Sequence, residues 1–122
     1  MVEKVPPEVE AKYAKLVRLR ETLAAVAQER ASLEALQSEL ETVLEEVKGL
    51  PENARLYKMV GGILLEKSRD EVLKELTERK EDVEIRLKAL KSQEEALRKD
   101  IERLTKELQE LLGRGRAGGT AG

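Results

Sequence analysis

The sequence predicts a mainly α-helical protein: an antiparallel two-helix coiled coil with one β-hairpin between the helices. Charged residues make up 39% of the 122 residues, and aromatic residues make up only 2%. A normal globular core is hard to build from this composition, which together with helical periodicity is typical of coiled coils. Two long apolar repeats flank a short Gly-containing segment, and this order indicates a chain that turns back on itself.

The first helix is expected over residues 7–48. Pro7 suits a helix start, because the first turn lacks partners for its N–H groups anyway. We expect the helix to end before Gly49, which would be a left-handed cap, and Pro51 would prevent its continuation. Between these limits apolar residues recur at alternating gaps of three and four, the spacing of a coiled-coil seam. The seam contains Val9, Leu16, Leu19, Leu23, Val26, Leu33, Leu40, Leu44 and Val47, with polar exceptions at Lys12, Arg30 and Gln37.

A β-hairpin is expected over residues 54–67. Two strand-like runs surround the pair Gly61-Gly62, which suits a two-residue hairpin turn. A loose loop and a continuing helix are the alternatives, and the helix is the weaker because Gly and Pro cluster here. A lone hairpin is marginally stable and exposes two unpaired edges, so we expect the chain to assemble with other subunits through the hairpin and the adjoining helix ends. The residues assigned to this assembly hairpin are Leu56, Tyr57, Met59, Val60, Gly61, Gly62, Ile63, Leu64 and Leu65.

The second helix is expected over residues 69–112. It opens with a capping box in which Ser68 and Glu71 would satisfy each other's exposed backbone donors. It should end at Gly113, so that residues 1–113 form the structured domain and the Gly-rich residues 114–122 form a disordered tail. Its seam contains Leu73, Leu76, Lys80, Val83, Leu87, Leu90, Glu94, Leu97, Ile101, Leu104, Leu108 and Leu111.

The two seams supply a register for the antiparallel pair. They match when the residue numbers of facing positions sum to 120, as for Leu16 with Leu104 and Leu33 with Leu87. Polar seam residues such as Lys80 either fix this register or simply extend their charged ends out of the seam. Near the hairpin a third apolar column, formed by Leu36, Val43, Leu50 and Val72, suggests further burial on assembly.

Several classes of function find no support in the sequence. The chain has no His and no Cys, and no phosphate-binding motif opens a helix, so we expect no enzyme and no catalytic, cofactor-binding or metal-binding residues. A net charge of −2 gives no electrostatic footprint for nucleic acid. No apolar run is long enough to span a membrane, and no signal-peptide core is visible. A cytoplasmic protein that contacts neither nucleic acid nor membrane is the expectation.

The helix ends far from the hairpin carry further apolar residues beside charged ones. Such an end could hold apolar surfaces of other proteins weakly, and it could equally just finish the seam. By spacing alone the second interpretation is favoured. The residues concerned are Val5, Val9, Tyr13, Leu108, Leu111 and Leu112, of which Val9, Leu108 and Leu111 occupy seam positions.

The stretch from Ala54 to Leu65, ARLYKMVGGILL, followed by a charged helix with Arg86-Leu87-Lys88-Ala89-Leu90, resembles archaeal prefoldin beta subunits. The opening from Val5 to Val9 is also similar to that family, and the likeness covers nearly the whole chain outside the Gly-rich tail. The run around Tyr57-Lys58 and Val60-Gly61 is the specific part, since any coiled coil shares the heptads.

The resemblance implies an ATP-independent chaperone, a holdase without cofactor. It implies a heterohexamer of two alpha and four beta subunits, whose hairpins assemble into an oligomeric β-barrel platform. This complex would bind unfolded client proteins at the coil tips and deliver them to a group II chaperonin. The single hairpin fits the beta type, because alpha subunits carry two. The residues assigned to client binding by position are the helix-end set named above.

Two other functions are alternatives to a chaperone. A structural or adaptor coiled coil without client binding would share every helix feature and differ at the hairpin and the helix ends. A nucleic-acid-binding coiled coil would need a continuous cationic helix, whereas the basic residues between Lys12 and Arg20 are interspersed with apolar seam residues.

Overall fold

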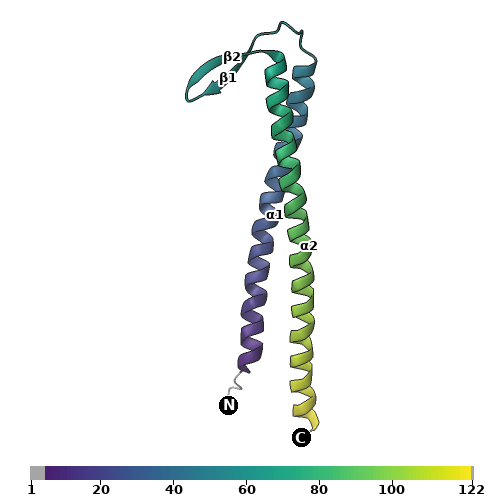
Figure 1. The fold of residues 1–122 in the computed structure, drawn as a ribbon. Coiled ribbons are helices and arrows are strands. Elements are labelled where there is room, and N and C mark those ends of the chain that lie inside the picture. Colours follow the sequence, from purple (N-terminus) through teal and green to yellow (C-terminus); the bar gives the residue numbers. More distant parts are fainter. Residues whose placement is uncertain (1–4, 122) are drawn as a thin grey trace. The chain divides into compact units, whose positions relative to one another are not determined.

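The computed structural model describes residues 5–121, with side chains described up to Arg114. Helix α1 (Pro7–Lys48) is followed by strands β1 (Leu56–Val60) and β2 (Ile63–Lys67) and by helix α2 (Arg69–Ala121), as Figure 1 shows. The predicted order of elements is confirmed. The chain divides into two compact units. We call Arg30–Ala89 the hairpin unit, and Met1–Glu29 together with Leu90–Gly122 the terminal unit.

In the hairpin unit, the helices pack through a small apolar core. Leu40 of α1 and Val83 and Leu87 of α2 are buried, and Leu33, Leu36 and Leu76 pack against them. Beside this core, Nζ of Lys80 lies 3.8 Å from a carboxylate oxygen of Glu41 and equally far from one of Glu84. Lys80 therefore extends its charged end out of the seam toward acids on both helices.

In the terminal unit, Leu16 of α1 is buried with Leu104 and Leu108 of α2, and Val9, Leu19 and Ile101 pack against this cluster. An ion pair joins Nζ of Lys12 to a carboxylate oxygen of Glu107 at 2.9 Å. Leu16 with Leu104 has the predicted sum of 120. The sums for the cross-helix pairs Lys12 with Glu107 and Glu41 with Lys80 are 119 and 121, so both units keep the predicted register.

The hairpin closes at the two-residue Gly-Gly turn that its sequence predicts. Strands β1 and β2 are antiparallel, and their pairs run from Leu56 with Lys67 to Val60 with Ile63. The two turn residues Gly61 and Gly62 have φ values of 56° and 81°. Positive φ at both central residues defines a type I′ turn, whose twist matches that of the strands.

The end of α1 differs from the expectation of a left-handed glycine cap. Among the described residues, only the two turn glycines have positive φ, so Gly49 is not such a cap. Instead the guanidinium of Arg69 donates hydrogen bonds to the carbonyl oxygens of Val47 and Lys48, at 3.3 and 2.9 Å. These carbonyls lack partners within α1, and the Val47 carbonyl also accepts a hydrogen bond from the Leu50 N–H at 3.1 Å. A side chain from the start of α2 therefore caps the end of α1.

Both ends of α2 differ from what the sequence predicts. At its start, the Glu71 N–H donates to the Ser68 hydroxyl oxygen at 3.1 Å, but the Glu71 carboxylate lies 4.0 Å from Nζ of Lys67. Only half of the capping box is therefore formed.

At its other end, α2 continues past Gly113 to Ala121. The helix therefore extends past the end expected at Gly113 and through residues 114–121, which were expected to belong to a disordered tail. Glycine lowers helix propensity by about 1 kcal/mol per residue without forbidding a helix, and no proline follows to stop this one. Gly122, the last residue of the predicted tail, and Met1–Lys4 lie outside the described residues.

Candidate functional site

The hairpin exposes apolar side chains on both of its faces. Because side chains alternate along a strand, Val60, Ile63 and Leu65 lie on one face, and Tyr57, Met59 and Leu64 lie on the other. Their exposed fractions run from 45% for Leu65 to 65% for Met59, and among the apolar residues of the two strands only Leu56 is partly buried. A strand pair that is apolar on both faces is typical of a sheet covered on both sides. The hairpin is therefore suited to bury itself against other chains.

Part of the third apolar column is buried within the chain. Leu36 packs against the core of the hairpin unit, and Val43 and Val72 are half-buried. Leu50, at the end of α1, is 37% exposed. The column therefore leaves less apolar surface free for a partner than the sequence suggested.

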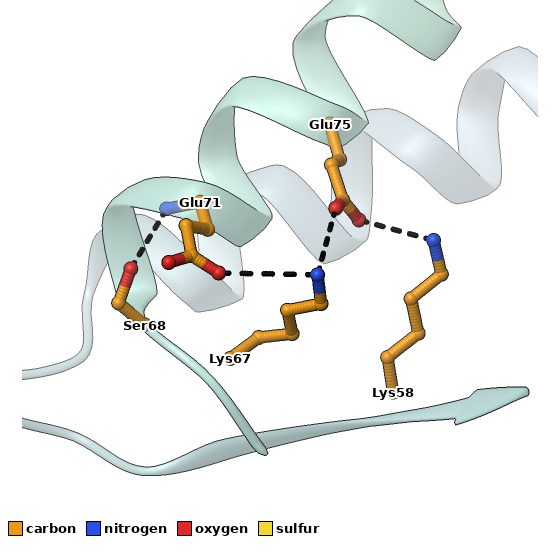
Figure 2. A network of polar contacts seen from close by, with 5 residues as sticks. All are labelled: Lys58, Lys67, Ser68, Glu71 and Glu75. Atoms are coloured by element: carbon orange, nitrogen blue, oxygen red, sulfur yellow. Dashed lines mark hydrogen bonds and ion pairs between the residues drawn. The ribbon is translucent and has the colours of Figure 1, made fainter. Parts of the chain in front are cut away.

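A network of charges connects the hairpin to α2. Nζ of Lys58 in β1 lies 3.2 Å from one carboxylate oxygen of Glu75, and Nζ of Lys67 in β2 lies 3.6 Å from the other. Figure 2 shows both lysine side chains converging on this carboxylate. The hydrogen bond from Lys58 is the main cause that lowers the pKa of Glu75, with attraction by both lysines adding to it and desolvation opposing it.

Neither this network nor the Arg69 cap was predicted from the sequence. The strand register of the hairpin could have indicated the charge network. Because Lys58 and Lys67 fall on the same face of the strand pair, both can reach a single acceptor on one side. No sequence pattern identified Glu75 as that acceptor, since acids occur throughout the first turns of α2.

The helix-end residues of the terminal unit fall into two groups. Val5, Tyr13 and Leu112 are exposed by 50%, 58% and 52%. Leu108 is buried in the core, Val9 packs against that core, and Leu111 is half-buried. The seam members of this set are thus engaged in helix packing, and the other three present apolar surface.

No group of three or more acidic residues that could hold a metal ion occurs among the described residues. Within the same part of the chain, no helix is long and apolar enough to cross a membrane. A groove of the terminal unit, bounded by Lys15, Asp100 and Arg103, is lined mostly by charged side chains. A groove of the hairpin unit beside β1 combines charged residues such as Asp82 with apolar ones such as Met59. The remaining candidates are the hairpin and the exposed helix ends.

Comparison with known proteins identifies the family to which this chain belongs. The family model "Prefoldin subunit" matches residues 10–115. This chain belongs to the prefoldin family. The resemblance seen in the residues from Ala54 to Leu65 is thereby confirmed.

Relatives of the beta type match this prefoldin chain along nearly its whole length. "Prefoldin subunit beta" of Archaeoglobus fulgidus is 43% identical over 108 residues, which cover 88% of this chain and 93% of the relative. The protein of the same name from Saccharolobus islandicus is 39% identical over 114 residues, covering 93% and 90% of the two chains.

Solved structures agree with this assignment. The crystal structure of the prefoldin beta subunit from Thermococcus strain KS-1 matches with a TM-score of 0.82 at 32% identity, covering 91% of this chain and 97% of that one. The beta2 subunit of that strain, at 21% identity and a TM-score of 0.66, shows likeness of fold. Membership in the prefoldin family implies a chaperone role and oligomerisation with other prefoldin subunits.

Proposed function

We propose that this chain is the beta-type subunit of an ATP-independent holdase that captures unfolded proteins and passes them to a group II chaperonin. In this proposal two alpha and four beta subunits form a heterohexamer, and their hairpins close into a β-barrel platform. The single observation that supports it best is the placement of exposed apolar side chains. They concentrate on the hairpin in one unit and near the helix ends in the other, as expected for separate assembly and client surfaces.

The client surface in this proposal consists of Val5, Tyr13 and Leu112. An unfolded protein exposes apolar side chains that a folded one buries, so weak apolar contacts discriminate between the two. Because each contact is small, several subunits acting together would supply the affinity through multivalency. Leu108, Val9 and Leu111 would support this surface by holding the two helices together, and only opening of the seam would bring Leu108 into contact with a client.

The test is suppression of aggregation of an unfolded enzyme by the assembled complex. A triple variant Val5→Ser, Tyr13→Ser, Leu112→Ser should still assemble and should lose most of the suppression. The matched control is Ile85→Ser, because Ile85 is an equally apolar residue that is 68% exposed in the hairpin unit. Equal suppression by the triple variant and the control would reject the client surface, and would favour a structural or adaptor role.

A further inference from the structure

The apolar cores of the two units leave the hairpin without support. Neither core cluster includes a residue of β1 or β2. A two-stranded hairpin is marginally stable in water, and β2 is separated from α2 by Ser68 alone. The direction in which the hairpin projects from α2 must therefore be set by contacts outside these cores.

Two of the contacts that join the hairpin to α2 converge on one carboxylate. Oε2 of Glu75 accepts a hydrogen bond from Nζ of Lys58 at 3.2 Å, while Oε1 lies 3.6 Å from Nζ of Lys67. The two lysines come from different strands but lie on the same face of the hairpin. Each strand thus contacts a different oxygen of the Glu75 carboxylate (Figure 2). Two such contacts restrict the rotation of the hairpin as well as its distance from α2.

The two lysines constrain the hairpin unequally. Lys67 is two residues from the start of α2, so chain connectivity already keeps it near Glu75. Lys58 is separated from Glu75 by 17 residues and lies on β1, the strand that is not directly joined to α2. The contact between Lys58 and Glu75 is therefore the one that ties the far strand to the helix.

We propose that Glu75 is the positioning residue that fixes the direction of the hairpin for subunit assembly, through Lys58 of β1 and Lys67 of β2. The assembly step rests on the proposed function, whereas the positioning step concerns the single chain alone. A hairpin already held in its assembled direction loses less conformational freedom on association, so assembly is favoured without any new contact between subunits.

The other charged groups around Glu75 are consistent with this role. Its own helix contributes Glu71, Glu78 and Arg79 nearby, and Glu71 shares Lys67 at 4.0 Å. A Glu carboxyl is ionised at neutral pH, and the shift of the Glu75 pKa is downward, so both lysines face an anion. Such half-exposed pairs are screened by salt, and we expect hairpin positioning to weaken as salt rises.

The first experiment measures hairpin direction in the full chain. The natural sequence has no Cys, so the pair Leu64→Cys and Glu81→Cys places one spin label on β2 and one on α2. Labelled chain is mixed with excess unlabelled chain, so that only distances within one molecule contribute. The parent chain should give one narrow distance distribution. Glu75→Gln and, independently, Lys58→Gln should each lose the narrow peak while retaining helical circular dichroism.

The matched control is Glu78→Gln. Glu78 lies one turn of α2 away, lines the same groove beside β1, and makes no ion pair among the described residues. Its variant should keep the narrow peak. If Glu75→Gln and Glu78→Gln give the same distribution as the parent chain, Glu75 does not position the hairpin and the inference is overturned.

The second experiment measures assembly with a prefoldin alpha subunit by light scattering across a range of concentrations. Glu75→Gln should raise the concentration needed for assembly, and Glu78→Gln should not. A broadened hairpin with unchanged assembly would overturn the assembly step. Neither result bears on client capture, which the helix-end variants test separately, so failure of this inference is distinguishable from failure of the proposed function.

Discussion

At the residue scale, the type I′ turn depends on backbone conformations that residues other than glycine rarely adopt. The φ values of 56° at Gly61 and 81° at Gly62 lie in the left-handed region, where an L residue costs about 1–2 kcal/mol. A Cβ at either glycine would meet no atom within 4 Å. The requirement for glycine therefore comes from the backbone and not from crowding.

This distinction leads to a prediction for two substitutions in the turn. Gly62→Val should destabilise the hairpin by about 1–2 kcal/mol, because a β-branched residue is poorly accommodated at positive φ. Gly61→Asn should be nearly neutral, because Asn-Gly is the preferred pair for this turn. Thermal unfolding of the assembled complex checks both. A loss of stability for Gly61→Asn as large as that for Gly62→Val would contradict the backbone explanation.

At the element scale, the stability of the helix pair depends on a narrow seam. Leu87 is 4% exposed in the core of the hairpin unit, whereas Ile85, two residues earlier on α2, is 68% exposed. Two aliphatic residues so close in sequence thus differ almost completely in burial. This contrast follows from helical geometry, in which only one narrow stripe faces the partner helix.

The contrast predicts unequal effects of truncation to alanine. Leu87→Ala should lower the free energy of unfolding by about 2–5 kcal/mol, because it leaves a cavity among Leu33, Leu40 and Val83. Ile85→Ala should change it by no more than about 0.5 kcal/mol, the usual range for surface positions. Chemical denaturation followed by helical circular dichroism measures both values. Similar losses for the two variants would mean that the predicted seam does not carry the stability.

The sequence predicted elements well where a pattern repeats and poorly where one contact decides. Heptad spacing located the seam, and the Gly pair located the turn, since each depends on local geometry. The position of the end of α1 was predicted correctly, but the predicted cause, a left-handed glycine cap, was not. The Arg69 guanidinium, which follows the hairpin in the chain, caps this end instead. The end of α2 was missed because glycine weakens a helix without stopping it. Glu75 was not found because its role depends on the direction of the hairpin, which no periodicity encodes.

A further prediction concerns the ion pair of the terminal unit. The hydrogen bond from Lys12, followed by its charge, lowers the pKa of Glu107 below the ordinary value of 4.5. A carboxyl whose pKa is depressed on folding contributes stability that is fully present above its unfolded pKa and is lost as pH falls through its folded pKa. Acidification below about pH 4.5 should therefore weaken the helix pair near its ends.

Carbon-detected nuclear magnetic resonance titration of the Glu107 carboxyl tests this sign. Its midpoint should lie below 4.5 in the parent chain and should rise toward that value in Lys12→Met. Methionine retains an apolar stem at this half-buried position while removing the charge. The variant should also lose less stability than the parent on acidification. A midpoint that does not respond to Lys12→Met would show that the ion pair is not formed in solution.

At the scale of the whole molecule, the hairpin is the surface that we propose links the chain to its partner subunits. Its exposed aliphatic side chains would each gain about 1.5–3 kcal/mol if assembly buried them fully. The two helices already have a seam in each unit and need no partner for their packing. Disturbing the hairpin should therefore separate the subunits and leave the helices folded.

The variant Val60→Asp examines this separation directly. Val60 is 47% exposed in the chain and neighbours the turn, and a charge there would be costly to bury in an assembled sheet. We expect helical circular dichroism to be retained and light scattering to report smaller species. Ile85→Asp adds the same charge to an exposed apolar position on α2 and should leave the oligomer mass unchanged. If Val60→Asp kept the full mass, the hairpin face that carries Val60 would not be part of the subunit interface, and assembly would have to depend on the opposite face with Met59 and Leu64.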